Sequence, residues 1–281
     1  MAKLDAVEIR LLLESDIPAA MQLKEAAGWN QTEDDWRRLL RLEPDGCFCA
    51  LKDGRLVGTT TTTTYGDELA WVGMVLIDPQ HRRQGIAAKL MSVALEYLNP
   101  RVRTVKLDAT ALGQPVYERF GFEVESLVER WSGAGNSRRI SDDRTDSLAE
   151  LFALDRVAFN ADRSKLIGEL VSRSAGSPVV VRDADGALSG YALARHGTRA
   201  SYVGPVVAKD PRQVETLLDQ VLSQLGDRPV YIDFNRECSA DTGLLSDRGF
   251  VKERDLIRMT AGRRSAKTSP FVIAIAGPEI G

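Results

Sequence analysis

Cysteine and histidine, which build disulfide frameworks and many metal sites, are scarce in this chain. There are three cysteines and two histidines among 281 residues, and an odd cysteine count does not suggest a disulfide framework. Cys47 and Cys49 stand two apart in an expected strand and would point to one face, which is neither a Cys-x-x-Cys redox motif nor half of a zinc site. His81 and His196 have no partner pattern. We therefore expect reduced cysteines, no metal site and a cytoplasmic location.

Long apolar runs and a strong charge of either sign are also missing. No stretch approaches the roughly 18 apolar residues of a membrane-spanning helix, and the opening MAKLDAVEIRLLLESD carries charges too early for a signal peptide. The net charge is −3 and the isoelectric point is about 5.6. We therefore expect neither nucleic acid nor a membrane as a partner.

The composition that remains is that of a globular protein with a sizeable core. Hydrophobic residues make up 43% of the chain and charged residues 27%, as in soluble domains. A length of 281 residues is long for one average domain and comfortable for two.

The most informative stretch is residues 71–98. Residues 72–77 form an apolar run with the length and β-branched content of a buried strand, which ends at Asp78-Pro79 because proline cannot continue a sheet ladder. A short basic loop, residues 80–84, leads to Gly85. Apolar residues then recur at helical spacing, at Ala87, Leu90, Met91, Ala94, Leu95 and Leu98. The pattern predicts a strand, a basic turn and a helix.

This arrangement suits a phosphate group. A helix start leaves its first backbone N–H groups without partners and carries partial positive charge. Gly85 and Ala87 are small, so a phosphate could approach the amides of residues 85–87, with Arg82 and Arg83 beside it. An ordinary strand-to-helix connection with solvated arginines is the alternative, because a single glycine after a strand is common.

Two motifs make the pattern more specific. Residues 82–87, RRQGIA, resemble the Arg/Gln-x-x-Gly-x-Gly/Ala signature of the GCN5-related N-acetyltransferase (GNAT) superfamily. Tyr117, followed four residues later by Gly121-Phe122, resembles that superfamily's Tyr-x-x-x-Gly-Phe element. Ala87 stands where glycine is common, which still leaves room for a phosphate.

The resemblance implies acetyl-CoA as a co-substrate and assigns roles to particular residues. The main chain at Val75 and Ile77 would pair with the pantetheine arm. Tyr117 would be the general acid that protonates the departing thiolate, which suits a phenol because it is a donor at neutral pH; the alternative is that Tyr117 only packs on its helix. The pyrophosphate would be held by Arg82, Arg83, Gln84, Gly85, Ile86 and Ala87.

Three residues are candidates for contact with the acceptor. Trp29 and Asn30 lie between the first two expected helices, a segment that often lines the acceptor pocket in the resembled superfamily. Asp108 lies in a strand beside the expected thioester and could orient the acceptor amine. A buried aspartate with its hydrogen bonds satisfied explains Asp108 equally well.

The second half of the chain repeats the first with parts missing. After a segment rich in Gly, Ser, Asn, Asp and Arg, which has the composition of a linker, the same order of expected elements recurs. Gly249-Phe250 corresponds to Gly121-Phe122 in the first half. Leu245 stands at the position that corresponds to Tyr117, and no Arg-x-x-Gly-x-Ala motif follows Pro211. The second half thus lacks both the phosphate loop and the acid.

We therefore expect an α/β (α+β) chain of two tandem acyl-CoA N-acyltransferase (GNAT-like) domains. Each would be a mixed, mainly antiparallel twisted sheet flanked by helices. Residues 1–134 would form the catalytic domain with the acetyl-CoA site, residues 135–143 a linker, and residues 144–281 a degenerate domain that shapes the acceptor pocket.

The expected reaction is transfer of an acetyl group from acetyl-CoA to a primary amine of a small molecule by direct attack, with Tyr117 as general acid. One alternative is an acetyltransferase for protein lysines or N-termini, which would want an open acidic groove between the domains. The other is a non-catalytic acyl-CoA sensor. The sequence leaves open whether two copies form a homodimer.

Overall fold

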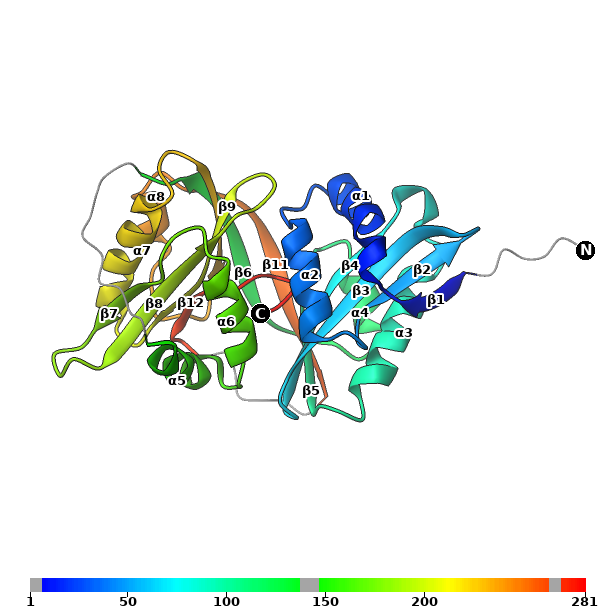
Figure 1. Cartoon of the computed structure of the whole chain (residues 1–281), viewed down its shortest axis with the longest axis horizontal. Helices are drawn as coiled ribbons and strands as arrows, with labels where there is room; N and C mark the ends of the chain where they lie inside the picture. The colour runs from blue at the N-terminus through cyan, green and yellow to red at the C-terminus, as the bar shows by residue number, and fades with distance from the viewer. Residues whose placement is uncertain (1–6, 137–146, 263–268) are drawn as a thin grey trace, which may run out of the picture.

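The computed structural model describes residues 7–136, 147–262 and 269–281. Its two halves share one order of elements from the first pair of helices to the last long strand, with one strand added at the start of the first half and one at the end of the second (Figure 1). We call residues 7–136 the first half and the described residues from 147 onward the second half. The first half contains β1 (Glu8–Leu11), α1 (Ile17–Ala27), α2 (Glu33–Leu42), β2 (Phe48–Lys52), β3 (Arg55–Tyr65), β4 (Leu69–Ile77), α3 (Ile86–Leu98), β5 (Thr104–Ala109), α4 (Gln114–Glu118) and β6 (Glu123–Ala134). The second half contains α5 (Leu148–Phe159), α6 (Ser164–Ser172), β7 (Val179–Arg182), β8 (Leu188–Arg195), β9 (Ser201–Ala208), α7 (Val214–Ser223), β10 (Pro229–Asn235), α8 (Gly243–Ser246), β11 (Val251–Gly262) and β12 (Val272–Ala274).

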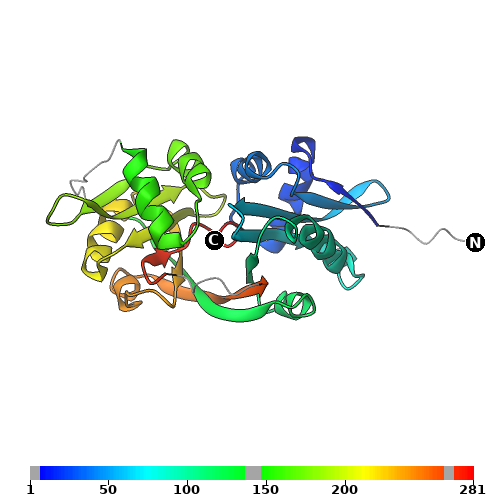
Figure 2. The same ribbon diagram turned by 90° about the horizontal axis from the view of Figure 1, so that it is seen from below.

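The strands of both halves form one sheet. Their order is β1-β2-β3-β4-β5-β11-β6-β10-β12-β9-β8-β7, so each half gives its last long strand to the other. Strand β11 lies between β5 and β6 and is antiparallel to both, whereas β6 pairs with β10. In Figure 2 these two strands cross from one lobe to the other along one side of the molecule. The mixed, mainly antiparallel sheet flanked by helices is confirmed, but it is continuous through both halves, which the sequence repeat did not predict.

Strands β4 and β5 are neighbours over only part of their length. Residues 69–71 of β4 pair in parallel with residues 104–106 of β5. Among the described residues no further pairing joins these two strands, although β4 continues to Ile77. One edge of β4 is therefore open from about Val72 onward.

The equivalent gap in the second half is filled. Residues 201–203 of β9 pair in parallel with residues 230–232 of β10, and beyond this stretch β12 lies between the two strands. Ala274 of β12 is paired with Phe234 on one side and with Val206 on the other. The chain's own last strand thus occupies the place that is open in the first half.

The helices cover both faces of the sheet. Helices α1, α2, α5 and α6 lie on one face, and α3 and α7 lie on the other (Figure 2). The largest hydrophobic cluster runs through both halves and includes Trp36 of α2, Leu154 of α5, Leu166 of α6 and Ile280 from the final segment. This shared core, like the exchanged strands, ties the halves together.

The expectations for cysteine and for membrane-spanning segments can be compared with the structure. All three cysteines are free, and burial raises the pKa of Cys47 to about 12 and the pKa values of Cys49 and Cys238 to about 11. These thiols are protonated, unreactive packing groups at neutral pH. None of the helices in the described residues has the length and apolar character needed to cross a membrane.

Candidate active site

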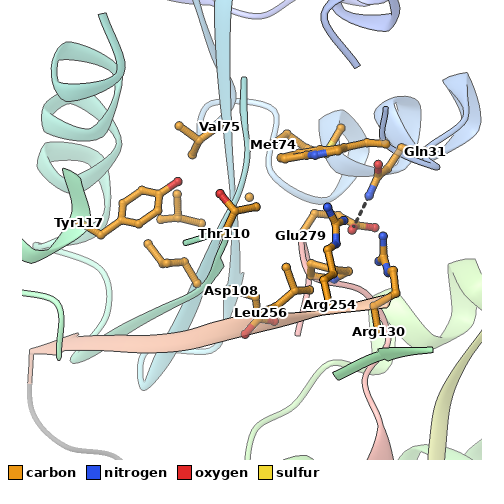
Figure 3. Close-up of a pocket in the computed structure, with 15 residues that line it drawn as sticks. Gln31, Met74, Val75, Asp108, Thr110, Tyr117, Arg130, Arg254, Leu256 and Glu279 are labelled. Atoms are coloured by element: carbon orange, nitrogen blue, oxygen red, sulfur yellow. Dashed lines mark hydrogen bonds between the residues drawn. The ribbon is translucent and has the colours of Figure 1, made fainter. Parts of the chain in front are cut away.

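A pocket opens where β4 separates from β5, and residues of both halves line it (Figure 3). The first half contributes Met74 and Val75 of β4 and Tyr117 of α4, and the second half contributes Leu256 of β11 and Glu279 of the final segment. The space between its lining atoms is about 510 Å³, a figure that includes the open mouth.

Tyr117 reaches the pocket from the short helix α4, which has a proline in its first turn. The residue is only 9% exposed, and its hydroxyl points toward the space between Val75 and Thr110 (Figure 3). Among the described residues no group forms a hydrogen bond with this hydroxyl. Burial raises the pKa of Tyr117, because an apolar site disfavours the phenolate. The hydroxyl is therefore a protonated donor that faces the pocket, and its role as general acid stays a prediction.

Strand β4 bulges where it borders the pocket. Met74 has a φ of +49°, which is uncommon for a residue other than glycine, and the pairing with β3 shifts register between Thr59 and Thr61. The Thr59 hydroxyl donates a hydrogen bond to the Met74 carbonyl at 2.8 Å. A bulge re-aims the main chain, and here it does so at Val75, which was predicted to contact the pantetheine arm. Ile77 lies farther along β4, opposite Gly58, and is not part of the pocket lining.

The predicted phosphate loop is exposed and leads directly into α3. Helix α3 begins at Ile86, as the sequence predicted, and Gly85 precedes it with a φ of +77° and no side chain capping the helix. Arg82, Arg83 and Gln84 are exposed, Ile86 is buried and Ala87 is half-buried. A Cβ atom built on Gly85 would meet no heavy atom within 4 Å, so the space before the helix start is open. Uncapped amides beside two arginines form a surface that fits an anion.

Asp108 lines the pocket, but its carboxylate is already engaged. Both of its oxygens accept hydrogen bonds from Arg258 of β11, at 2.8 Å each, and both side chains are buried. Burial raises the pKa of Asp108, and Arg258 opposes that shift. The Arg258 guanidinium also lies 4.6 Å from the centre of the Trp71 ring. This geometry matches the alternative of a buried, paired aspartate, and contact with the acceptor stays a prediction.

Trp29 and Asn30 are both near the pocket but differ in what they contact. Trp29 is part of the lining. The Asn30 side chain instead binds the main chain of the second half: its Nδ2 donates to the Ala200 carbonyl at 2.9 Å, and its Oδ1 accepts from the amides of Arg199 and Ala200. Asn30 borders only a smaller neighbouring cavity. It therefore joins the two halves rather than facing Tyr117.

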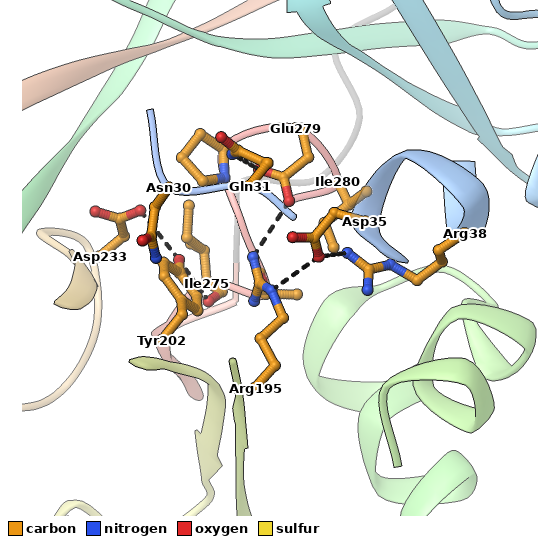
Figure 4. Close-up of polar contacts among 12 residues, drawn as sticks. Asn30, Gln31, Asp35, Arg38, Arg195, Tyr202, Asp233, Ile275, Glu279 and Ile280 are labelled. Atoms are coloured by element: carbon orange, nitrogen blue, oxygen red, sulfur yellow. Dashed lines mark hydrogen bonds and ion pairs between the residues drawn. The ribbon is translucent and has the colours of Figure 1, made fainter. Parts of the chain in front are cut away.

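The end of the pocket away from Tyr117 is polar. Arg130 of β6 donates two hydrogen bonds to Asp233 of β10, at 2.8 and 2.6 Å, and this buried pair bridges the halves. Glu279 accepts from Gln31 Nε2 at 2.9 Å and from Arg195 at 3.2 Å. Figure 4 shows that the Arg195 guanidinium lies between Glu279 and Asp35, and that Asp35 in turn contacts Arg38. A network of paired charges thus supports this wall.

The sequence reasoning missed this polar end entirely. Gln31, Arg130, Arg254, Pro278 and Glu279 all line the pocket, yet they come from segments up to 248 positions apart in the chain. Only Gln31 had a signal, because it follows Trp29 and Asn30 directly. The others have no motif around them.

The second half retains the geometry around its glycine but not the functional groups. Gly121 and Gly249 both have a φ of +78°, and the amide of the residue after each bonds back to the carbonyl of Tyr117 or Leu245. Leu245 is completely buried in the core. Helix α7 begins at Val214 after residues in an ordinary helical turn, without a glycine of positive φ. Within the described ranges no cluster of three or more histidine, cysteine, aspartate or glutamate residues could hold a metal ion.

Comparison with known families gives one match for each half. A model of the acetyltransferase (GNAT) family matches residues 13–122, and a model of an acetyltransferase (GNAT) domain matches residues 151–270. The two matches lie on either side of the predicted linker. They include the predicted phosphate loop and Tyr117 in the first half and Leu245 in the second.

Relatives and solved structures cover nearly the whole chain. An uncharacterized N-acetyltransferase of Bacillus subtilis is 24% identical over 88% of this chain and 88% of its own length. Holothin acyltransferase of a Pseudoalteromonas species is 23% identical over 91% of this chain and 88% of its own. The solved structure of a proposed acetyltransferase from Pyrococcus horikoshii superposes with a TM-score of 0.83 at 21% identity, covering 100% of this chain and 98% of the other.

Proposed function

Because this chain belongs to the GNAT acetyltransferase family, with two such domains in tandem, we propose that it moves an acetyl group from acetyl-CoA to a primary amine of a small molecule. One observation carries the proposal. The open edge of β4 lies between the uncapped basic start of α3 and a buried tyrosine whose hydroxyl has no hydrogen-bond partner within the part of the chain that the structure describes. In an extended acyl-CoA, the pyrophosphate would lie at the helix start, the pantetheine arm along the open edge of β4 and the thioester near the tyrosine.

The residues fit acetyl-CoA in their chemistry. The amides of Gly85, Ile86 and Ala87 would bind the pyrophosphate, with Arg82, Arg83 and Gln84 around it. The main chain of Val75 and Ile77 would take the pantetheine arm along the edge of β4 that β5 leaves open. Acetyl-CoA would supply an activated acyl group at the point where β4 bulges.

Tyr117 would supply the proton in the reaction. The acceptor amine would lose a proton to water as it attacks the thioester carbonyl, the C–S bond would break, and Tyr117 would give its hydroxyl proton to the departing thiolate and regain one from solvent. A backbone N–H near Val75 would stabilise the negative charge on the carbonyl oxygen. Holding both reactants in one pocket would supply most of the rate.

The second half would have a supporting role. It has no glycine at the start of α7, it has Leu245 where the acid would stand, and β12 occupies the gap between β9 and β10. We infer that it binds no second acyl-CoA. Its β11 and final segment complete the acceptor side of the pocket, which favours a small acceptor over a protein.

The test combines a screen of amines with a change in the phosphate loop. Wild-type protein should release CoA from acetyl-CoA when a suitable amine is added. Gly85→Glu should weaken acetyl-CoA binding about tenfold or more, because it places a negative charge and a strained backbone where the phosphates bind. Gly186→Glu is the matched control, since Gly186 also has positive φ and open surroundings but lies in the β7–β8 turn.

Two results would contradict the proposal in different ways. If Gly85→Glu and Gly186→Glu bind acetyl-CoA with equal affinity, the loop before α3 is not part of the acetyl-CoA site. Tight acetyl-CoA binding by the wild type without CoA release, across the whole amine panel, would favour a sensor over an enzyme.

A further inference from the structure

The charges that line the pocket are balanced by partners with one exception. Four charged side chains contribute to the lining. Three of them form ion pairs: Asp108 with Arg258, Arg130 with Asp233, and Glu279 with Arg195. The fourth, Arg254, has no hydrogen bond or ion pair with any residue that the structure describes. The pocket therefore carries one uncompensated positive charge.

Arg254 is exposed to solvent where it lines the pocket, yet it lies beside a like charge on the neighbouring strand. Arg254 of β11 stands directly opposite Arg130 of β6 in the antiparallel ladder, and like charges in such pairs destabilise a sheet. Desolvation, followed by the charge of Arg130, lowers the pKa of Arg254. Asp233 and Glu253 offset this only from beyond ion-pair distance. An anion placed at Arg254 would offset the like charge of Arg130 and supply the partner that Arg254 lacks among the described residues.

We propose that the acceptor is an amine that also carries an anionic group, and that Arg254 binds this group at the end of the pocket opposite Tyr117. The inference rests on the proposed function, since it names the class of acceptor for the same site. Figure 3 shows Tyr117 at one end of the pocket and Arg254 with Arg130 at the other. The amine would lie near Val75 and Tyr117, and a carboxylate or phosphate-like group would lie on the guanidinium.

The phosphates of acetyl-CoA do not account for Arg254. They are expected at Gly85, at the start of α3, whereas Arg254 comes from β11 and lies with Arg130, Glu279 and Gln31 at the polar end of the pocket, to which both halves contribute (Figure 3). A guanidinium presents paired N–H donors that match a carboxylate or a phosphate. Amines with a second positive charge would be repelled at this end.

The experiment uses acceptors of matched chain length that differ in their terminal group. Linear ω-amino acids of increasing length are each compared with their primary amide and with the corresponding aminoalkylphosphonate, and kcat and KM are measured from CoA release. The variants are Arg254→Ala and Arg254→Lys. Arg212→Ala is the control, since it also removes one positive charge but from an exposed side chain before α7.

Wild-type protein should prefer the anionic acceptor over the matched amide by about tenfold or more in kcat/KM, because paired, charge-assisted hydrogen bonds from a guanidinium are stronger than neutral ones. Arg254→Ala should abolish that preference, mainly through KM, and leave the amide within about twofold of wild type. Arg254→Lys should keep part of the preference for the anionic acceptor, and Arg212→Ala should keep all of it. The carboxylate and phosphonate arms show which anion fits better.

Equal use of acids and amides by the wild type would overturn the inference, as would a preference that survives in Arg254→Ala. If no amine of any charge releases CoA, the proposed function fails instead. Calorimetric titration of the acetyl-CoA-bound protein with the acids and amides then decides the inference by itself. The inference is supported if the acids bind more tightly than the amides and this difference disappears in Arg254→Ala. It is overturned if acids and amides bind equally well, or if Arg254→Ala binds the acids as tightly as the wild type does.

Discussion

At the scale of single residues, the environment of Tyr117 determines what its hydroxyl can do. The side chain packs edge-on against Phe122, with ring centres 6.2 Å apart, and it is buried without a hydrogen-bond partner among the described residues. Burial raises the pKa of Tyr117, so the hydroxyl stays protonated through about pH 10, where a solvated phenol ionises. The proton is therefore available over the whole neutral and mildly alkaline range.

Replacing Tyr117 by phenylalanine should affect the reaction and not the fold. We expect Tyr117→Phe to lower kcat by about 10²–10⁴-fold, the usual contribution of a general acid. The free energy of unfolding should change by less than about 0.5 kcal/mol, because no hydrogen bond is lost. Steady-state kinetics from pH 6 to 10 and denaturant unfolding measure the two effects, and the wild-type rate should show no alkaline fall from this group in that range.

The matched control is Tyr97→Phe, which should give the opposite result. The Tyr97 hydroxyl, near the C-terminal end of α3, donates to Glu43 at 2.5 Å, and Tyr97 is not part of the pocket lining. Its loss should cost about 1 kcal/mol of stability and leave kcat unchanged. An unchanged kcat in Tyr117→Phe, over a broad range of amines and pH, would mean that Tyr117 is not the acid.

At the scale of elements, the acceptor side of the site depends on a close crossing of two segments. The final segment passes over β4 at Gly73, where an added Cβ would lie 2.6 Å from both the Cα and the carbonyl oxygen of Glu279. Hydrogen bonds hold the segment on either side of this point. Trp71 donates to the Pro278 carbonyl at 3.0 Å, and Tyr65 donates to the Ile280 carbonyl at 2.6 Å. Only glycine permits this contact.

A methyl group at Gly73 should push the final segment away from β4. We expect Gly73→Ala to lower the free energy of unfolding by about 1–3 kcal/mol, the typical cost of overpacking, and to raise KM for the amine because Glu279 moves. Gly168→Ala in α6 is the control. Its nearest neighbour is 3.7 Å away, and alanine should stabilise a helix by up to about 1 kcal/mol. If the two variants have equal stability and equal KM, this crossing does not shape the site.

At the scale of the whole molecule, the exchange of strands makes each half incomplete without the other. The first half ends its own sheet at β5 and needs β11 beside it, and β6 lies between β11 and β10 of the second half. The buried Arg130–Asp233 pair joins β6 to β10, and the largest core cluster draws side chains from both halves. The chain has two family domains but one continuous sheet and one shared core.

Unfolding should therefore occur in a single step. For the intact chain we expect one transition, with equal calorimetric and van't Hoff enthalpies. A fragment of residues 1–140 should not fold as a stable monomer, because its β5 edge and the β11 side of β6 would be unpaired. Co-expression with residues 141–281 should restore a folded complex, detected by circular dichroism and size-exclusion chromatography. A monomeric fragment with its own sharp transition would show that the halves are independent.

The features that the sequence by itself determined are local ones. The basic loop, Gly85 and the start of α3 at Ile86 occupy consecutive positions, so their pattern in the chain is already their pattern in space. Tyr117 and Gly121-Phe122 likewise lie close together in the chain. The repeated order of expected elements predicted a second domain. Helix spacing, turn residues and strand composition act over a few residues, and a single sequence displays them directly.

Only the tertiary structure decided the exchange of β6 and β11, the filling of the second gap by β12 and the polar end of the pocket. Strand pairing depends on main-chain hydrogen bonds that almost any residues can make, so nothing in β11 marks β5 as its neighbour. Arg254 is an ordinary arginine in the sequence and becomes unusual only opposite Arg130. Glu279 and Gln31 meet across 248 positions, and such a contact exists only once the chain has folded.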